Sequence, residues 1–305
     1  MSKYEKKDSF EKYGFRIVRG ILNPEEIIEI RKKIDEVYLK SEKKYFKYSN
    51  RYLLSDAFLE NKELSFIYQQ IMFNEKVVSS LKEALGNDMT YFSDINLQRN
   101  MFGGWHTDVD SEKRSPYLLD DNYRFAKCAM LLQDNTKEFG GFVDVLPKSH
   151  VHYKNLLKVN RNPIKIFKQV YSGLLLELKI KFFPFTVPAK AGDLVFFDYR
   201  LLHSATKPRA IENWKNIPSD RTKYMFYWNS CHNDMVDTFL KHSQFRSILH
   251  DNNEESFFTV YLANCYPDDY PQDFVDSAKK SQVNIASLDK GQSEIFKKIQ
   301  QQYID

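Results

Sequence analysis

Apolar side chains recur with a helical period in two early stretches of the chain. In the first stretch, Asn23 and Pro24 are typical of a helix N-cap and first helical position. The apolar positions that follow among charged residues are Ile27, Ile28, Ile30, Ile34, Val37 and Tyr38. The second stretch covers residues 61–86 and ends at Gly86, with Ile67, Ile71, Val77, Val78 and Leu81 on its apolar side. Both stretches predict amphipathic helices packed on a core.

From Met89 the period changes to that of a β-strand, in which side chains alternate between two faces. Phe92, Asp94, Asn96 and Gln98 share one face, and Ser93, Ile95, Leu97 and Arg99 share the other. The polar face fits the inside of a barrel that holds a ligand, and it also fits a solvated edge strand. Short apolar runs bounded by turn residues predict further strands at residues 125–132, 142–146 and 194–197.

Lys127 is the one charged residue of the apolar run at residues 125–132. A buried lysine requires an anionic partner or a water-filled cavity. The side chain can instead reach solvent from the end of the strand. The sequence leaves both interpretations open.

Candidate chemistry lies in the segment Gly104-Trp105-His106-Thr107-Asp108 and in a distant histidine, His203. On a strand, His106 and Asp108 point to the same side, so a third ligand has to come from another strand. His203 qualifies because it follows a Gly-Asp turn and a buried apolar run. Two imidazoles and one carboxylate leave one face of a metal open, which suits a non-haem Fe(II) oxygenase. A zinc hydrolase uses the same ligand types, and a non-catalytic binding module is a further alternative.

Composition limits the remaining choices. With 305 residues, of which 42% are hydrophobic, the chain can bury one substantial core, so a single domain is expected. The sequence has no apolar run long enough for a membrane span and no apolar stretch typical of a secretory signal. Its three widely spaced cysteines fit a reducing compartment. The net charge of +4 is too small to indicate a nucleic-acid partner. We therefore expect a cytoplasmic protein with neither a membrane nor a nucleic-acid partner.

Much of the chain, about residues 8–230, resembles the phytanoyl-CoA dioxygenase family of Fe(II)/2-oxoglutarate-dependent oxygenases. The resemblance rests on residues 10–26, the motif at 104–108, residues 140–150 and the segment that ends at His203. It implies a mainly β fold with flanking helices, namely a double-stranded β-helix, or jelly roll, of the cupin-like kind.

Resemblance to this family also implies how one oxygenase domain is divided. The expected parts are an N-terminal strand and helices at residues 8–88, a jelly-roll core at 89–230 with an insertion at 151–187, and a mainly helical C-terminal extension at 231–305. In the motif at residues 147–150, Lys148 stands where the family usually has glycine. The family's histidine at the position of His150 does not hold iron, so a structural role is expected for it.

The same resemblance implies that His106, Asp108 and His203 hold Fe(II), with 2-oxoglutarate and O₂ as co-substrates. An arginine is expected to bind the distal carboxylate of 2-oxoglutarate, because its planar fork can contact both oxygens. Arg221 opens a strand-like segment and is preferred over Arg209, which lies in a turn-like Lys-Pro-Arg sequence. Gln98 matches the polar strand residue that contacts 2-oxoglutarate in the family.

Hydroxylation with release of succinate and CO₂ is the expected reaction, and desaturation or oxidative cyclisation stay open. Halogenation is disfavoured because related halogenases lack the carboxylate that Asp108 supplies. Residues 109–124 lack any period and are expected to form a lid over the site. Basic residues in and after the lid predict a small, anionic substrate, although they also fit an ordinary solvated surface. The candidate substrate-binding residues are Trp105, Arg114, Arg124 and Lys127, and Lys113 is a further basic residue of the lid.

Overall fold

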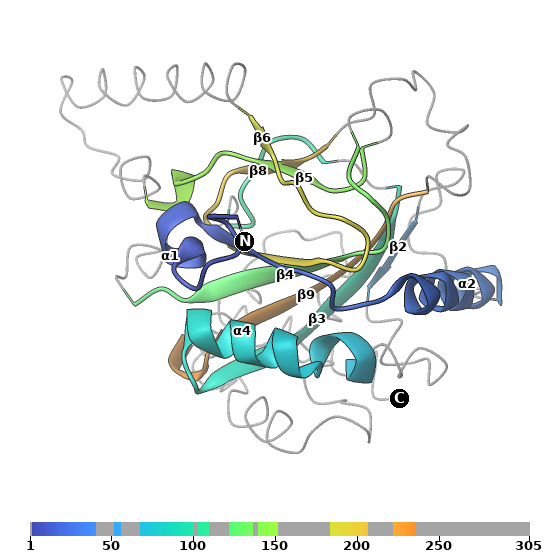
Figure 1. The fold of residues 1–305 in the computed structure, drawn as a ribbon, viewed down its shortest axis with the longest axis horizontal. Helices are drawn as coiled ribbons and strands as arrows, with labels where there is room; N and C mark the ends of the chain where they lie inside the picture. Colours follow the sequence, from blue (N-terminus) through green and yellow to red (C-terminus); the bar gives the residue numbers. More distant parts are fainter. Residues whose placement is uncertain are drawn as a thin grey trace, which may run out of the picture.

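Two antiparallel sheets form the centre of the protein in a computed structural model. The structure describes residues 2–40, 52–55, 68–100, 103–109, 122–136, 140–151, 184–206 and 222–235. The larger sheet contains, in spatial order, β1 (Phe15–Val18), β7 (Leu194–Asp198), β4 (Phe125–Leu131), β9 (Tyr224–His232), β3 (Met89–Arg99) and β2 (Tyr52–Ser55). The smaller sheet contains β6 (Phe185–Thr186), β5 (Val143–Val145) and β8 (His203–Ala205). The two sheets face each other, and α4 (Glu75–Leu85) covers the other side of the larger one (Figure 1). This is the predicted jelly roll.

The apolar residues of the larger sheet divide between its two faces. On β4, Ala126, Cys128 and Met130 belong to the cluster that packs against the helices. Ala129 and Leu131 belong to a second cluster, which includes Val143 and Val145 of the smaller sheet. Alternation along a strand therefore separates an outer core beneath the helices from an inner core between the sheets.

The first predicted helix is α2 (Pro24–Lys40), and it begins where the sequence indicated. The Asn23 side chain accepts a hydrogen bond from the Glu26 backbone N–H at 2.9 Å, and the Glu26 carboxylate accepts one from the Asn23 N–H at 2.7 Å. This reciprocal pair is a capping box. Ile30 and Ile34 are fully buried, but Ile28 is 67% exposed and does not belong to the packed face as predicted.

The second predicted helix is not continuous. Its described part consists of a π-helical turn, η2 (Tyr68–Met72), followed by α4. Asn74 separates the two because its side chain accepts a hydrogen bond from the Lys76 backbone N–H at 3.0 Å and so caps a new helix. Gly86 ends α4 with φ of 109°, as its position predicted. The remaining short helices are α1 (Ser9–Tyr13) and η7 (Asn233–Met235).

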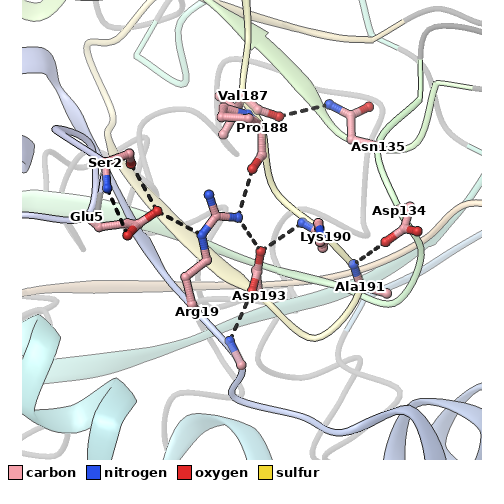
Figure 2. Close-up of polar contacts among 11 residues, drawn as sticks. Ser2, Glu5, Arg19, Asp134, Asn135, Val187, Pro188, Lys190, Ala191 and Asp193 are labelled. Atoms are coloured by element: carbon pink, nitrogen blue, oxygen red, sulfur yellow. Dashed lines mark hydrogen bonds and ion pairs between the residues drawn. The ribbon is translucent and has the colours of Figure 1, made fainter.

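A buried carboxylate fixes the turn that leads into β7. Asp193 accepts hydrogen bonds from the backbone N–H groups of Gly20 at 3.0 Å and Lys190 at 2.8 Å. It also accepts one from the Arg19 guanidinium at 2.6 Å, which reaches the Pro188 carbonyl as well (Figure 2). Asp193 thereby ties the end of β1 to the start of β7.

The backbone of the motif at residues 147–150 explains why glycine is expected at the position of Lys148. Lys148 adopts a left-handed backbone conformation with φ of 71°, which glycine takes without strain. His150 is buried, and its Nε2 atom lies 2.9 Å from the backbone carbonyl oxygen of Glu11 in α1. It lies outside the cluster of candidate metal ligands, as expected.

Several predictions fall on residues outside the described ranges. These are most of the proposed lid at residues 109–124, most of the insertion at 151–187, and the C-terminal extension beyond residue 235. Among the helices that the structure describes, none has the length and apolar character needed to cross a membrane.

Candidate metal centre

The structure brings His106, Asp108 and His203 together through main-chain hydrogen bonds. The backbones of His106 and His203 form a two-way bridge, with N···O distances of 2.9 and 3.0 Å. The Asp108 backbone N–H donates to the Tyr199 carbonyl at 3.0 Å. His106 and Asp108 do not lie on a continuous strand as predicted, because the chain turns directly after the single bridge at His106. The turn still directs both side chains toward His203.

The potential ligand atoms of these residues lie within 4.8 Å of one another. Nε2 of His106 is 4.0 Å from Oδ1 of Asp108, and Nε2 of His203 is 4.0 Å from Oδ2 of the same carboxylate. The side chains differ in burial, with 42% exposure for His106, 13% for Asp108 and 8% for His203. One side of the cluster is therefore accessible, and the other is buried in the barrel.

Both imidazoles present the nitrogen that a metal would need. Nδ1 of His106 is 2.7 Å from the Gly104 carbonyl, and Nδ1 of His203 is 2.9 Å from the Leu201 carbonyl. A carbonyl oxygen accepts a hydrogen bond from a protonated Nδ1, which leaves the Nε2 lone pair directed at Asp108. Burial lowers the pKa of His203, although the Asp108 carboxylate opposes this effect. A neutral imidazole and a carboxylate are the forms that bind a divalent cation, so this donor set fits Fe(II).

The larger sheet supplies the inner wall beside the centre. The Phe197 ring on β7 lies 4.7 Å from the His203 ring, measured between centroids. Burial raises the pKa of Tyr227 on β9, and the charge of Asp108 raises it further. Lys127 on β4 places its Nζ atom 5.5 Å from the centre of the Tyr227 ring. The sequence did not identify Phe197 and Tyr227 as residues of the site, because each lies in an apolar run that predicts an ordinary core strand.

The other candidate residues have different positions. Gln98 is half-buried on β3 opposite Met225, whose side chain belongs to the inner core, so Gln98 faces the barrel interior as expected. Trp105 is half-buried directly before His106. Arg124 is exposed and lines a cavity of about 480 Å³ with Asp198 and Arg200, and this cavity has none of the three candidate ligands in its wall. Arg114, Arg209 and Arg221 lie outside the described residues.

The structure also identifies a buried cation that was not among the candidate residues. Lys223 directly precedes β9 and is 1% exposed. Its backbone N–H donates to the Asn100 side chain, and its carbonyl accepts from the Asn100 N–H, both at 2.9 Å. Burial lowers the pKa of Lys223 from 10.5 to about 7. The sequence could have indicated this position, because Lys223 lies two and four residues before Met225 and Tyr227, and alternation therefore places it on the barrel side of the strand.

Comparison with known proteins identifies the family of the chain. The chain is 22% identical to ectoine dioxygenase of Nocardia farcinica (strain IFM 10152), over 77% of this chain and 80% of the relative. The crystal structure of the non-haem α-ketoglutarate-dependent carbocyclase SnoK from nogalamycin biosynthesis has a TM-score of 0.51 and 16% identity, covering 75% of this chain and 83% of that one. Residues 10–209 match the phytanoyl-CoA dioxygenase family. The chain belongs to this family, and the protein is a non-haem dioxygenase that uses Fe(II), 2-oxoglutarate and O₂.

Proposed function

We propose that His106, Asp108 and His203 hold the Fe(II) of this dioxygenase and that the enzyme hydroxylates a small, anionic metabolite. The observation that carries the proposal is the convergence of two imidazole Nε2 atoms on one carboxylate, all within 4.8 Å. Their partial exposure on one side provides the access that a co-substrate and a substrate require. A zinc hydrolase would use similar ligands, but family membership supports the oxygenase.

Each residue of the centre has a defined task. The two Nδ1 atoms face carbonyl groups, which fix the rings so that both Nε2 atoms point toward Asp108 and would bind the cation there. Asp108 contributes negative charge and occupies the ligand position that a halide would need, which disfavours halogenation. When bound, Fe(II) together with 2-oxoglutarate activates O₂, and the oxidation of 2-oxoglutarate to succinate and CO₂ drives oxidation of the substrate. Desaturation and oxidative cyclisation use the same centre and are the alternative outcomes.

The distal carboxylate of 2-oxoglutarate needs a cation deep in the barrel. Arg221 stays our prediction for this role, with Arg209 as the alternative from the sequence. Lys223 is a third candidate, because it is buried at the start of β9 and alternation places it on the side of Met225 and Tyr227. Gln98, on the barrel side of β3, is proposed to contact the same co-substrate.

An anaerobic titration with Fe(II) and 2-oxoglutarate tests the proposed ligands. Chelation of the metal by 2-oxoglutarate produces a weak visible charge-transfer band, which we expect in the wild type. His203→Ala should abolish the band because it removes a buried ligand. His232→Ala is a matched control at the far end of β9, outside the cluster, and should leave the band intact. A full band in His203→Ala would contradict the assignment.

A further inference from the structure

Lys127 occupies an unusual place on the inner wall of the barrel. Along β4, alternation puts it on the same face as Ala129 and Leu131, both of which belong to the inner core. Its neighbours in the sheet are Phe197 on β7 and Asn229 on β9. Phe197 contacts the ring of His203, so Lys127 stands beside a wall residue of the metal centre.

The Lys127 ammonium is directed into the barrel. Its Nζ atom lies 5.5 Å from the centre of the Tyr227 ring, which packs against the inner core. Tyr227 pairs with Ala129, two residues after Lys127 on β4, so the Lys127 side chain extends toward the middle of the strand. This orientation disfavours the alternative in which the lysine reaches solvent from the strand end.

Three buried or half-buried arginines of the described ranges have carboxylate partners. Arg16 pairs with Glu83 at 2.8 Å, Arg19 with Asp193 at 2.6 Å and Arg200 with Asp198 at 2.7 Å. Within the described ranges, Lys127 forms no such pair, and its Nζ atom lies over the face of the Tyr227 ring. A half-buried cation needs an anion or solvent for compensation. The barrel therefore offers a positive charge to a ligand beside the metal centre.

We propose that Lys127 is a specificity-determining residue, whose ammonium binds the anionic group of the primary substrate, a carboxylate, phosphate or sulfate. This inference rests on the proposed function, and it assigns selection of the substrate to the wall of the site formed by β4. The co-substrate is the competing anion, and Lys223 is the described residue among the cations considered for its distal carboxylate. Lys223 is six residues from Asn229, the β9 partner of Lys127, or roughly 20 Å of strand.

The test uses small anions as probes, since these carry the proposed binding group. Sulfate, methyl phosphate and acetate are titrated by calorimetry, in a buffer free of chloride, into the anaerobic protein loaded with Fe(II) and 2-oxoglutarate. We expect the wild type to bind at least one probe, and Lys127→Met to weaken that binding by about tenfold or more. Lys127→Arg should keep most of it. Lys12→Met is the matched control, because Nζ of the exposed Lys12 lies 5.8 Å from the centre of the Tyr13 ring, away from the centre.

The affinity for 2-oxoglutarate, read from the charge-transfer band in the same samples, separates the possible outcomes. It should change by less than about threefold in Lys127→Met, which also shows that the variant is folded. The proposal is overturned if the wild type binds none of the probes, or if Lys127→Met binds them as the wild type does. A parallel loss of 2-oxoglutarate affinity would also overturn it and assign Lys127 to the co-substrate. Failure of the proposed function looks different, because the band would then be absent in the wild type.

Discussion

Replacing Lys223 by methionine removes a charge that folding buries almost completely. The side chain is 1% exposed in the native protein, and burial lowers its pKa from 10.5 to about 7. In the unfolded chain the ammonium is hydrated and keeps its ordinary pKa. Methionine has a similar length and no charge, so it fills much of the same volume without the cost of desolvation.

The pKa difference of 10.5 − 7, or about 3.5 units, sets the size of the effect. Each unit corresponds to about 1.4 kcal/mol, so the lysine costs on the order of 4 kcal/mol of folding free energy at pH 7. The cost is complete below pH 7, because both states then bind the proton. It decreases as the pH rises from about 7 to 10.5 and vanishes above that range, since the folded pKa is the lower one.

We therefore expect Lys223→Met to be more stable than the wild type by about 2–4 kcal/mol at pH 7, allowing for relaxation around the buried charge. The gain should shrink steadily toward pH 10. Urea unfolding at pH 6.5, 8 and 9.5 measures it, with Lys76→Met on the exposed start of α4 as a control that should change stability by less than about 0.5 kcal/mol. A variant that is less stable than the wild type, or a gain that does not depend on pH, would refute this account of Lys223.

The remaining predictions concern the metal centre, the co-substrate and the fold. Asp108→Ala should abolish coupled substrate oxidation and weaken Fe(II) binding, whereas Asp88→Ala, at an exposed position, should do neither. Undiminished turnover in Asp108→Ala would contradict the ligand assignment. Arg221→Ala should weaken 2-oxoglutarate binding by roughly 2–5 kcal/mol and Arg209→Ala by much less, as measured by titration, and the reverse order would assign Arg209. Asp193→Ala should lower the free energy of unfolding by about 2–4 kcal/mol in urea, because it leaves two backbone N–H groups without their acceptor and removes one of the two carboxylates that pair with Arg19. A loss below about 1 kcal/mol would show that water replaces the carboxylate.

The sequence predicted the elements whose signals are local. The capping box at Asn23 depends on residues three positions apart, so the start of α2 could be located from the letters alone. Alternation likewise located β3, and a short apolar run bounded by turn residues located β4. The candidate ligands were identified by residue type and by family resemblance, and the structure brings them together.

The features that the sequence could not predict depend on contacts between distant segments. Alternation shows that Lys127 and Ala129 share a face, but only the pairing with β7 and β9 shows that this face lies beside the metal centre. The break at Asn74 was missed because asparagine is tolerated in a helical pattern and its capping bond is visible only in the structure. Ile28 follows the helical spacing, yet no element covers it within the described ranges.

The position of the metal centre follows from the way the two sheets meet. His203 begins β8 of the smaller sheet, and its main chain bridges to His106, while Asp108 is tied to the loop after β7 of the larger sheet. The backbone of each candidate ligand is thus fixed by main-chain hydrogen bonds. Side-chain substitutions at these positions keep those bonds. They should therefore remove metal binding while the barrel stays folded, which is the condition under which ligand variants report on chemistry and not on stability.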